Sequence, residues 1–259
     1  MTETFAEGGL ILTPGRIATL TLDRPQRRNA MTRAMWAAVP DICDRISDDP
    51  TIRVLILTGA GDKAFCAGAD ILEFATVYAT PEAAAEYNTL VRLAQQRLRD
   101  LRCPVIAAIR GACYGGGCGL ALACDFRVAE GAAQFAITPA RLGLAYSPAD
   151  TWQLIEKVGV SRAKDLLLTG RAIEVDEALE IGLIDRVDQT AQTLAGHLAG
   201  LAPNALRAIK AVCNGLSLPV APAPLHQAFE ETFASAEFRE GYTAFLEKRA
   251  PDFEKELKP

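Results

Sequence analysis

Two stretches of small residues could place main-chain amides against a carbonyl oxygen. Lys63–Ile71 reads KAFCAGADI and Gly111–Leu120 reads GACYGGGCGL, and each follows an apolar segment. Small side chains let a ligand approach the backbone closely, and free N–H groups at the start of a helix attract negative charge. Two such amides aimed at one oxygen would stabilise an oxyanion. Either stretch alone is more often a tight turn between a strand and a helix.

The sequence offers few residues for nucleophilic catalysis, metal binding or dinucleotide binding. His197 and His226 are the only histidines, and both lie in helical patterns near the C-terminus. Cys118 is therefore a poor candidate for an acyl nucleophile, because no histidine is available in sequence to activate it. The cysteines show no zinc-type spacing, so we expect no metal site. The dinucleotide-binding fingerprint fits the segment from Gly111 only poorly.

Composition narrows the class of protein further. The chain has 259 residues, 50% of them hydrophobic and 23% charged, which suits one large α/β domain or a domain with a helical appendage. The net charge of −5 gives no general attraction to nucleic acid or anionic membranes. An odd number of cysteines, seven, favours free thiols in a reducing compartment. Met1–Gly9 lacks a signal-peptide pattern, so we expect a cytoplasmic protein.

Strand and helix patterns alternate through the first half of the chain. We expect strands at Arg16–Leu22, Arg53–Thr58, Pro104–Ile109, Phe126–Val128 and Gln134–Ile137. We expect helices at Asn29–Asp48, Pro81–Leu101, Ala149–Val158, Ser161–Leu168, Val175–Ile181 and Thr190–Leu201. Pro203–Lys258 reads as three more helices, broken near Leu218–Pro224. The predicted class is α/β with a helical C-terminal region.

The two small-residue stretches together resemble the paired oxyanion-hole motifs of the crotonase (enoyl-CoA hydratase/isomerase) superfamily, and the resemblance covers nearly the whole chain. Further matching motifs lie in order at Leu22–Ala30, Leu168–Arg171, Ala178–Asp185 and Glu240–Arg249. The resemblance implies a spiral of ββα turns over residues 1–200, with acyl-CoA binding and catalysis. It implies a helical region over residues 201–259 that builds a homotrimer or hexamer. No cofactor is implied beyond the coenzyme A of the substrate.

The resemblance also implies roles for individual residues. The backbone N–H groups of Ala69 and Gly116 would bind the thioester oxygen. Phe245 and Lys248 would reach the coenzyme A of a neighbouring subunit; without the resemblance, Lys248 reads as a solvated helix charge. The full set of expected substrate contacts is Arg24, Arg28, Ala67, Gly68, Asp70, Ile71, Tyr114, Gly115, Gly119, Pro139, Phe245 and Lys248. Asp70 reads as structural in the family, and Tyr114 could simply shape the pocket.

The chain departs from the family's hydratases at both acid–base positions. Hydratases carry two glutamates, and the matching positions here are Gly119 and Pro139. Neither side chain ionises, and loss of general acid–base help costs on the order of 10²–10⁴-fold per group. Efficient hydration is therefore not expected, and neither is isomerisation that relies on the second glutamate.

The segment Thr138–Tyr146 (TPARLGLAY) is similar to that of the family's methylmalonyl-CoA decarboxylases. There a tyrosine at the position of Tyr146 is thought to address the departing carboxylate. Decarboxylation of a malonyl-type thioester yields an enolate directly, so orientation and the oxyanion hole matter more than a strong base. Those decarboxylases, however, carry a histidine at the position of Ala69 and keep a glutamate at that of Gly119. Alternatively, Tyr146 lines the acyl pocket with its hydroxyl bonded to the backbone.

Two further interpretations stay open. Asp150 could act as an unusual acid–base group in a hydratase or isomerase, although a carboxylate that begins a helix is the simpler interpretation. The chain could also be an acyl-CoA-binding protein without catalysis, because a fold does not guarantee a function.

Overall fold

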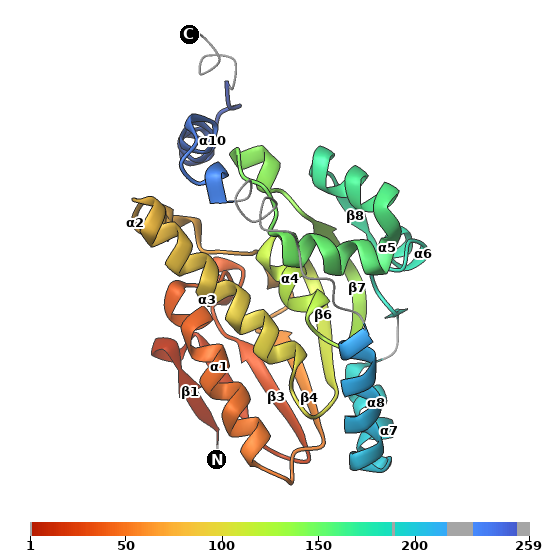
Figure 1. Ribbon diagram of the computed structural model, residues 1–259. Coiled ribbons are helices and arrows are strands. Elements are labelled where there is room, and N and C mark those ends of the chain that lie inside the picture. The colour runs from red at the N-terminus through yellow and green to blue at the C-terminus, as the bar shows by residue number, and fades with distance from the viewer. Residues whose placement is uncertain (1, 188–189, 217–229, 253–259) are drawn as a thin grey trace.

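A mixed sheet forms the centre of the fold, with nine strands among the residues that the computed structural model describes (2–187, 190–216 and 230–252; Figure 1). The strand order is β1-β2-β3-β4-β6-β7-β8, with β5 beside β6 and β9 beside β7. The strands are β1 Glu3–Phe5, β2 Leu10–Thr13, β3 Ile17–Leu22, β4 Val54–Gly59, β5 Ala64–Cys66, β6 Val105–Tyr114, β7 Phe126–Ala136, β8 Ala172–Glu174 and β9 Arg186–Val187.

Helices cover both faces of this sheet. They are α1 Arg33–Asp48, α2 Phe74–Val77, α3 Pro81–Arg99, α4 Gly116–Leu122, α5 Pro148–Thr169, α6 Val175–Glu180, α7 Ala191–Gly200, α8 Pro203–Leu216 and α10 Ala236–Glu247. Short 3₁₀ turns lie at η1 Ala6–Gly8, η2 Pro25–Arg27, η3 Ile71–Glu73 and η4 Pro139–Leu142. No helix in the described part of the chain is both long and apolar enough to cross a bilayer.

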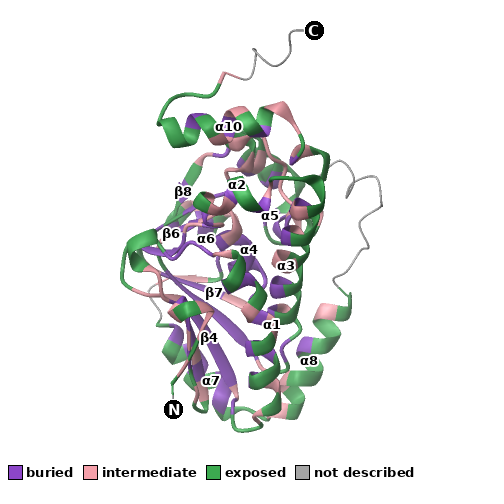
Figure 2. Cartoon of the chain, turned by 90° about the vertical axis from the view of Figure 1, so that its left-hand side faces the viewer, coloured by how far each residue is buried: buried purple, intermediate pink, exposed green. Residues whose placement is uncertain are grey.

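Alternation along the central strands assigns side chains to the two faces. In β4, Leu55 and Leu57 belong to the core shared with α1 and α3, whereas Val54 and Ile56 belong to a second cluster with α7. Successive side chains of a strand point to opposite faces, so a strand covered on both sides is apolar throughout. Figure 2 shows these central strands buried and the outer sides of the helices exposed.

Parallel pairing brings the two small-residue stretches to one edge of the sheet. β5 and β6 run parallel, with Cys66 opposite Cys113. Both chains therefore leave the sheet in the same direction, β5 into Ala67–Asp70 and β6 into the turn at Gly115 that begins α4. This topology positions the candidate site.

The α/β class is confirmed, and several predicted boundaries are wrong. The helix expected from Asn29 begins at Arg33, because Thr32 caps it and Asn29 takes a left-handed backbone with φ 55°. The strand expected to end at Ile109 continues to Tyr114, because β5 and β7 pair with its second half. Likewise, the two strands expected within residues 126–137 are one strand.

Other elements match closely or were missed. The two helices expected between Ala149 and Leu168 form α5, whose turn at Gly159 is non-helical. Strands β1, β2, β5, β8 and β9 were not predicted, since each has only two to four residues. The break expected near residues 218–224 lies outside the described residues. The expected boundary near residue 200 falls between α7 and α8, and its interpretation as a domain border stays a prediction.

Contacts of α8 and of α10 attach the C-terminal helices to the rest of the fold. Lys210 of α8 is buried and pairs with Asp125 at 2.7 Å, and its ammonium also donates to the Cys103 carbonyl at 3.0 Å. Farther along, α10 packs on η4 so closely that a Cβ on Gly143 would overlap the backbone of Glu237. The α10 contact matters for the site, because η4 leads directly into the segment that carries Tyr146.

Candidate active site

The turns that carry Ala69 and Gly116 touch one another. A Cβ placed on Gly116 would lie 3.6 Å from the Ala69 nitrogen, and one placed on Gly68 would lie 3.3 Å from the Gly116 nitrogen. Gly68 and Gly115 have φ of +98° and +50°, values that side chains other than glycine rarely adopt. Glycines at these positions therefore let two main-chain amides come together at one point.

Neither of the two amides is used by the protein's own hydrogen bonds among the described residues. The segment ending at Met31 pairs with the turn: Met31 donates to the Gly68 carbonyl at 2.8 Å and accepts from the Asp70 amide at 2.8 Å. That pairing leaves the Ala69 amide between them free. Gly116 is the first residue of α4, where amides have no acceptor within the helix. Both donors are thus available to a ligand oxygen.

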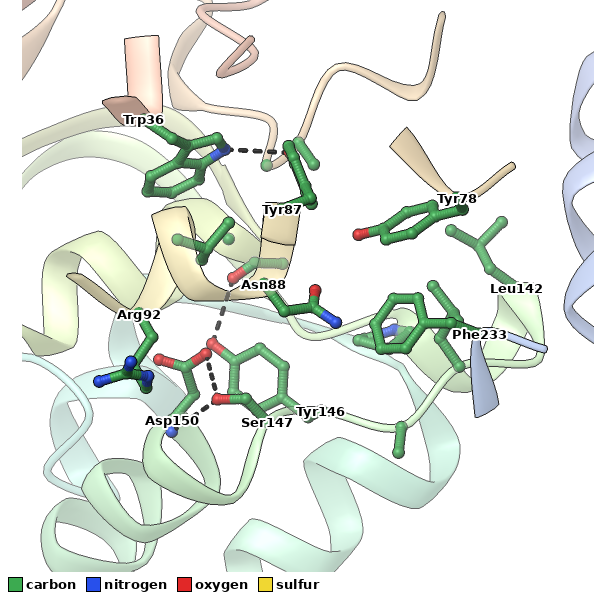
Figure 3. A pocket seen from close by; sticks show the side chains of 18 of the residues that line it. Trp36, Tyr78, Tyr87, Asn88, Arg92, Leu142, Tyr146, Ser147, Asp150 and Phe233 are labelled. Atoms are coloured by element: carbon green, nitrogen blue, oxygen red, sulfur yellow. Dashed lines mark hydrogen bonds between the residues drawn. The ribbon is translucent and has the colours of Figure 1, made fainter. Parts of the chain in front are cut away.

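A cavity of about 220 Å³ opens beside these amides (Figure 3). Its aromatic wall contains Trp36, Phe74, Tyr78, Tyr87 and Phe233. The Trp36 indole donates to the Tyr87 hydroxyl at 3.1 Å, so these two polar groups satisfy each other within the wall. Such a wall suits an apolar acyl chain, with specificity left to the few polar groups around it.

Tyr146 lines the cavity and bonds to the oxyanion turn. Its hydroxyl donates to the Gly115 carbonyl at 3.2 Å (Figure 3). That carbonyl and the Gly116 amide belong to the same peptide unit, so the bond helps to fix the direction of the Gly116 N–H. Burial raises the pKa of Tyr146 well above its usual value, with Asp150 adding to the shift, which keeps the hydroxyl protonated. The alternative interpretation, a pocket residue bonded to backbone, is confirmed; a role toward a departing carboxylate stays a prediction.

Asp150 both begins a helix and lines the cavity. Its backbone amide donates to Ser147 Oγ at 3.0 Å, and Ser147 Oγ donates to Asp150 Oδ2 at 2.7 Å. The other carboxyl oxygen, Oδ1, is buried without a hydrogen-bond partner among the described residues. Burial raises the pKa of Asp150 to about 6, and the Ser147 hydroxyl and the Gln95 amide oppose that shift. A group with this pKa exchanges protons near neutral pH.

Gly119 faces Gln95 and Asp150 from α4. A Cβ on Gly119 would lie 2.3 Å from Gln95 Nε2 and 3.1 Å from Asp150 Oδ1. The Gln95 amide therefore occupies the space that a side chain at residue 119 would fill. Pro139, at the second glutamate position, also lines the cavity and brings no ionisable group. The ionisable group nearest to the Cβ position of Gly119 is therefore Asp150 of α5.

The remaining predicted site residues fall into three sets. Five line the same cavity as the two amides: Ala67, Gly68, Ile71, Gly115 and Pro139. Arg24 and Asp70 form an ion pair, with 2.8 Å between Arg24 Nη1 and Asp70 Oδ2. The Asp70 side chain also accepts a hydrogen bond from the Leu72 amide and so caps η3. Asp70 thus has a structural role, as the family resemblance suggested. Arg28 is exposed in the left-handed conformation, and its carbonyl accepts from the Ala67 amide at 3.0 Å.

Three predicted contacts lie away from the cavity. Tyr114 is not part of the cavity lining, and its hydroxyl donates to Gln134 Oε1 at 3.1 Å, so its expected substrate contact stays a prediction. Phe245 of α10 and Lys248, which follows that helix, are exposed and also lie outside the lining. Their expected contact with a neighbouring subunit's coenzyme A stays a prediction.

Sequence reasoning missed the polar side of the cavity. Asn88, Arg92 and Gln95 of α3 all line it. Their spacing of four and then three residues was visible in the sequence and places them on one helix face. The helix itself was predicted, but its pattern alone does not reveal which face meets the cavity.

Comparisons with known proteins agree with this geometry. The family model for enoyl-CoA hydratase/isomerase matches residues 13–256. A crotonyl-CoA hydratase of Syntrophomonas wolfei is 36% identical, over 92% of this chain and 94% of that protein. The crystal structure of an enoyl-CoA hydratase/carnithine racemase of Magnetospirillum magneticum is 37% identical with a TM-score of 0.78, covering 95% of each chain. A methylmalonyl-CoA decarboxylase in complex with 2-nitronate-propionyl-CoA is 25% identical with a TM-score of 0.82, covering 94% of this chain and 97% of that one.

Proposed function

The chain belongs to the enoyl-CoA hydratase/isomerase family of the crotonase superfamily, and from that premise we propose that it stabilises the enolate of an acyl-CoA thioester between the amides of Ala69 and Gly116. The observation that carries the proposal is the convergence of two amides, both without acceptors among the described residues, at one end of a cavity with apolar walls. Preorganised donors at a developing oxyanion are each worth about 10²–10³ in rate. Coenzyme A enters as part of the substrate, and no other cofactor is required.

The favoured reaction is decarboxylation of a malonyl-type thioester. The bond between the α-carbon and the carboxyl carbon breaks, carbon dioxide leaves, and the electron pair forms the thioester enolate. A proton from the neutral form of Asp150 then completes the α-carbon, and water restores that proton. Support comes from the lack of an ionisable side chain at both Gly119 and Pro139. It also comes from the similarity of Thr138–Tyr146 to the decarboxylases and from the decarboxylase among the similar structures.

Carbon dioxide release from methylmalonyl-CoA and ethylmalonyl-CoA tests this reaction. We expect release by the wild-type protein and a loss of at least 100-fold in Gly116→Val, whose side chain would enter the space beside the Ala69 amide. Gly196→Val is the control, because Gly196, like Gly116, lies in a helix without a positive φ but has no neighbouring atom within 4 Å of its Cβ position. If the protein releases carbon dioxide from none of the malonyl thioesters, decarboxylation is excluded as its reaction.

A second candidate is hydration or isomerisation with Asp150 as the acid–base group. The observation that favours it is the partnerless Oδ1 of Asp150, close to the position where hydratases of the family carry a glutamate. The absorbance change of crotonyl-CoA measures hydration directly. This candidate predicts a rate that Asp150→Asn lowers by about 100-fold. A rate that Asp150→Asn leaves unchanged contradicts it, and CoA binding without any turnover would indicate a non-catalytic protein.

We also propose a homotrimer or hexamer that resides in the cytoplasm. α8 exposes Ile209, Val212 and Leu216 at spacings of three and four residues, which forms one apolar helix face. Burial of such a face against a second copy is a common reason for assembly. All seven cysteines are free, as expected of a reducing compartment.

A further inference from the structure

The side of α3 that faces the cavity carries hydrogen-bond donors. Asn88, Arg92 and Gln95 are separated by four and three residues, so they lie on one face of the helix. All three line the cavity, as do Tyr146 and Asp150 (Figure 3). We call these three residues the α3 donor face.

These donors lack well-formed bonds to protein acceptors among the described residues. Asn88 Nδ2 and Gln95 Nε2 are fully buried atoms without a well-formed hydrogen bond, although Gln95, a residue only 4% exposed, lies close enough to Asp150 to lower the pKa of that carboxyl. Arg92 forms no ion pair there, whereas Arg33 and Arg97, on the two helices of the same layer, pair with Glu86 and Asp44. Buried donors without acceptors cost free energy, so the amides of Asn88 and Gln95 beside the cavity point to an acceptor that arrives with a ligand, and the exposed Arg92 is available to the same ligand.

The donor face also lies where the reacting end of an acyl group would be. Gln95 Nε2 reaches the Cβ position of Gly119, one turn of α4 beyond the Gly116 amide. A thioester whose oxygen is bound by that amide would thus have its α- and β-carbons near Gln95. The Tyr146 hydroxyl already donates its hydrogen bond to the Gly115 carbonyl. The donors left for a polar group on the acyl chain are therefore those of α3.

We propose that Asn88, Arg92 and Gln95 form a subsite for an anionic group on the acyl chain, so that the substrate is a carboxyacyl-CoA. The proposal rests on the acyl-CoA function proposed above and assigns the part of the site that selects the acyl group. Two carboxyl groups also line the cavity, Asp150 and Glu230. Glu230 is exposed to solvent, and Ser147 holds one oxygen of Asp150. Arg92 is the one cation of the α3 donor face and supplies the charge-assisted bond, while the neutral amides of Asn88 and Gln95 add further donors.

A matched pair of thioesters tests the subsite. Methylmalonyl-CoA and isobutyryl-CoA differ only by a carboxylate in place of a methyl group. Their dissociation constants are measured by stopped-flow tryptophan fluorescence on the millisecond timescale, before turnover, with Trp36 in the cavity wall as a reporter. We expect the wild-type protein to bind methylmalonyl-CoA at least 10-fold more tightly than isobutyryl-CoA. Succinyl-CoA and butyryl-CoA provide a second pair, with the carboxylate one carbon farther from the thioester.

Variants of the α3 donor face should remove the preference and leave thioester binding itself in place. Arg92→Gln and Gln95→Met are each expected to reduce the methylmalonyl-to-isobutyryl preference by about 10-fold, with the isobutyryl-CoA constant changed less than about 3-fold. Gln96→Met, an exposed neighbour on the same helix, and Arg162→Gln, an exposed arginine of α5, are the controls and should keep the preference.

The outcomes separate this inference from the function on which it rests. If both thioesters bind equally in the wild-type protein, or if the variants keep the full preference, the subsite is overturned while acyl-CoA binding stands. If no acyl-CoA binds at all, the proposed function fails together with the subsite. A preference that both variants abolish, in a protein that binds isobutyryl-CoA normally, supports the assignment.

Discussion

At the scale of single residues, one peptide unit connects the candidate chemistry. The Gly116 amide donates toward the cavity, and the carbonyl of the same unit, that of Gly115, accepts from the Tyr146 hydroxyl and from the Gly119 amide. Hydrogen bonds in such a series polarise one another, so a donor to the carbonyl strengthens the N–H on the other side. Tyr146 is in this view a positioning residue that acts through the peptide.

Tyr146→Phe tests the positioning role. We expect kcat to fall about 5- to 50-fold, with KM for the same thioester within about 2-fold, because the oxyanion peptide is less well oriented while the cavity keeps its shape. Tyr114→Phe is the matched control, since its hydroxyl bonds to Gln134 outside the cavity lining. An unchanged kcat in Tyr146→Phe would show that the peptide needs no such support.

The pH dependence of the rate tests Asp150. Its pKa of about 6 predicts an inflection near that pH, which Asp150→Asn removes and Asp41→Asn, on the exposed side of α1, retains. If the neutral carboxyl protonates an enolate, the rate falls as pH rises through 6. If the carboxylate acts as a base in hydration, the rate rises there. An inflection that persists in Asp150→Asn would exclude both roles.

The same group makes stability depend on pH. Because the pKa of Asp150 rises from 3.8 to about 6 on folding, the folded state holds its proton more tightly and loses stability as pH increases from about 4 to 6. Two pKa units correspond to about 3 kcal/mol once both states are ionised. Asp150→Asn should therefore raise the free energy of unfolding by up to about 3 kcal/mol at pH 8 and by less than about 1 kcal/mol at pH 4. Urea denaturation at the two pH values measures the difference; equal gains would contradict the linkage.

At the scale of elements, the contact of α10 with η4 supports the segment that leads to Tyr146. Gly143 and Gly241 allow the two backbones to touch, and a Cβ on Gly143 would lie 2.3 Å from the Glu237 carbonyl carbon. Six aromatic rings continue this contact toward the cavity, in edge-on or tilted pairs: Phe74, Tyr78, Tyr87, Phe233, Phe238 and Tyr242. The C-terminal helix thus forms part of the wall that holds the substrate.

Gly143→Ala tests that packing. The new methyl group should displace α10, and we expect a loss of about 2–4 kcal/mol in the free energy of unfolding from the clash and the left-handed backbone together. Gly131→Ala carries a similar positive φ with no atom near its Cβ position, so it should cost only about 1–2 kcal/mol. Equal losses in the two variants would mean that the contact contributes nothing beyond backbone strain.

At the scale of the whole molecule, the exposed apolar face of α8 bears on assembly. Val212→Glu places a charge at the centre of that face, between Ile209 and Leu216. We expect the variant to sediment as a monomer at a concentration at which the wild-type protein forms a trimer or hexamer, since an uncompensated charge is costly in an apolar interface. Ala211→Glu, exposed on the opposite side of α8, should assemble normally. A wild-type monomer would contradict the proposed assembly.

Local pattern was sufficient for much of the fold. The apolar runs of β3, β4 and β6 and the amphipathic spacing of α1 and α3 follow from local rules, and these elements were predicted within a few residues at all but two of their ends. The errors arose where tertiary contacts overrode the local signal. Residues 111–114 look like a turn because they contain glycine and small side chains, yet they extend β6 because strands lie on both sides.

The sequence by itself determined the fold class, the family resemblance and the two small-residue stretches, because these depend on residue types and short spacings. Only the tertiary structure decided that Gln95 of α3, Gly119 of α4 and Asp150 of α5 meet, and that Tyr146 reaches the Gly115 carbonyl. Sequence spacing sets geometry within one element. How side chains of separate elements approach one another depends on the packing of those elements, which emerges only when the whole core is assembled.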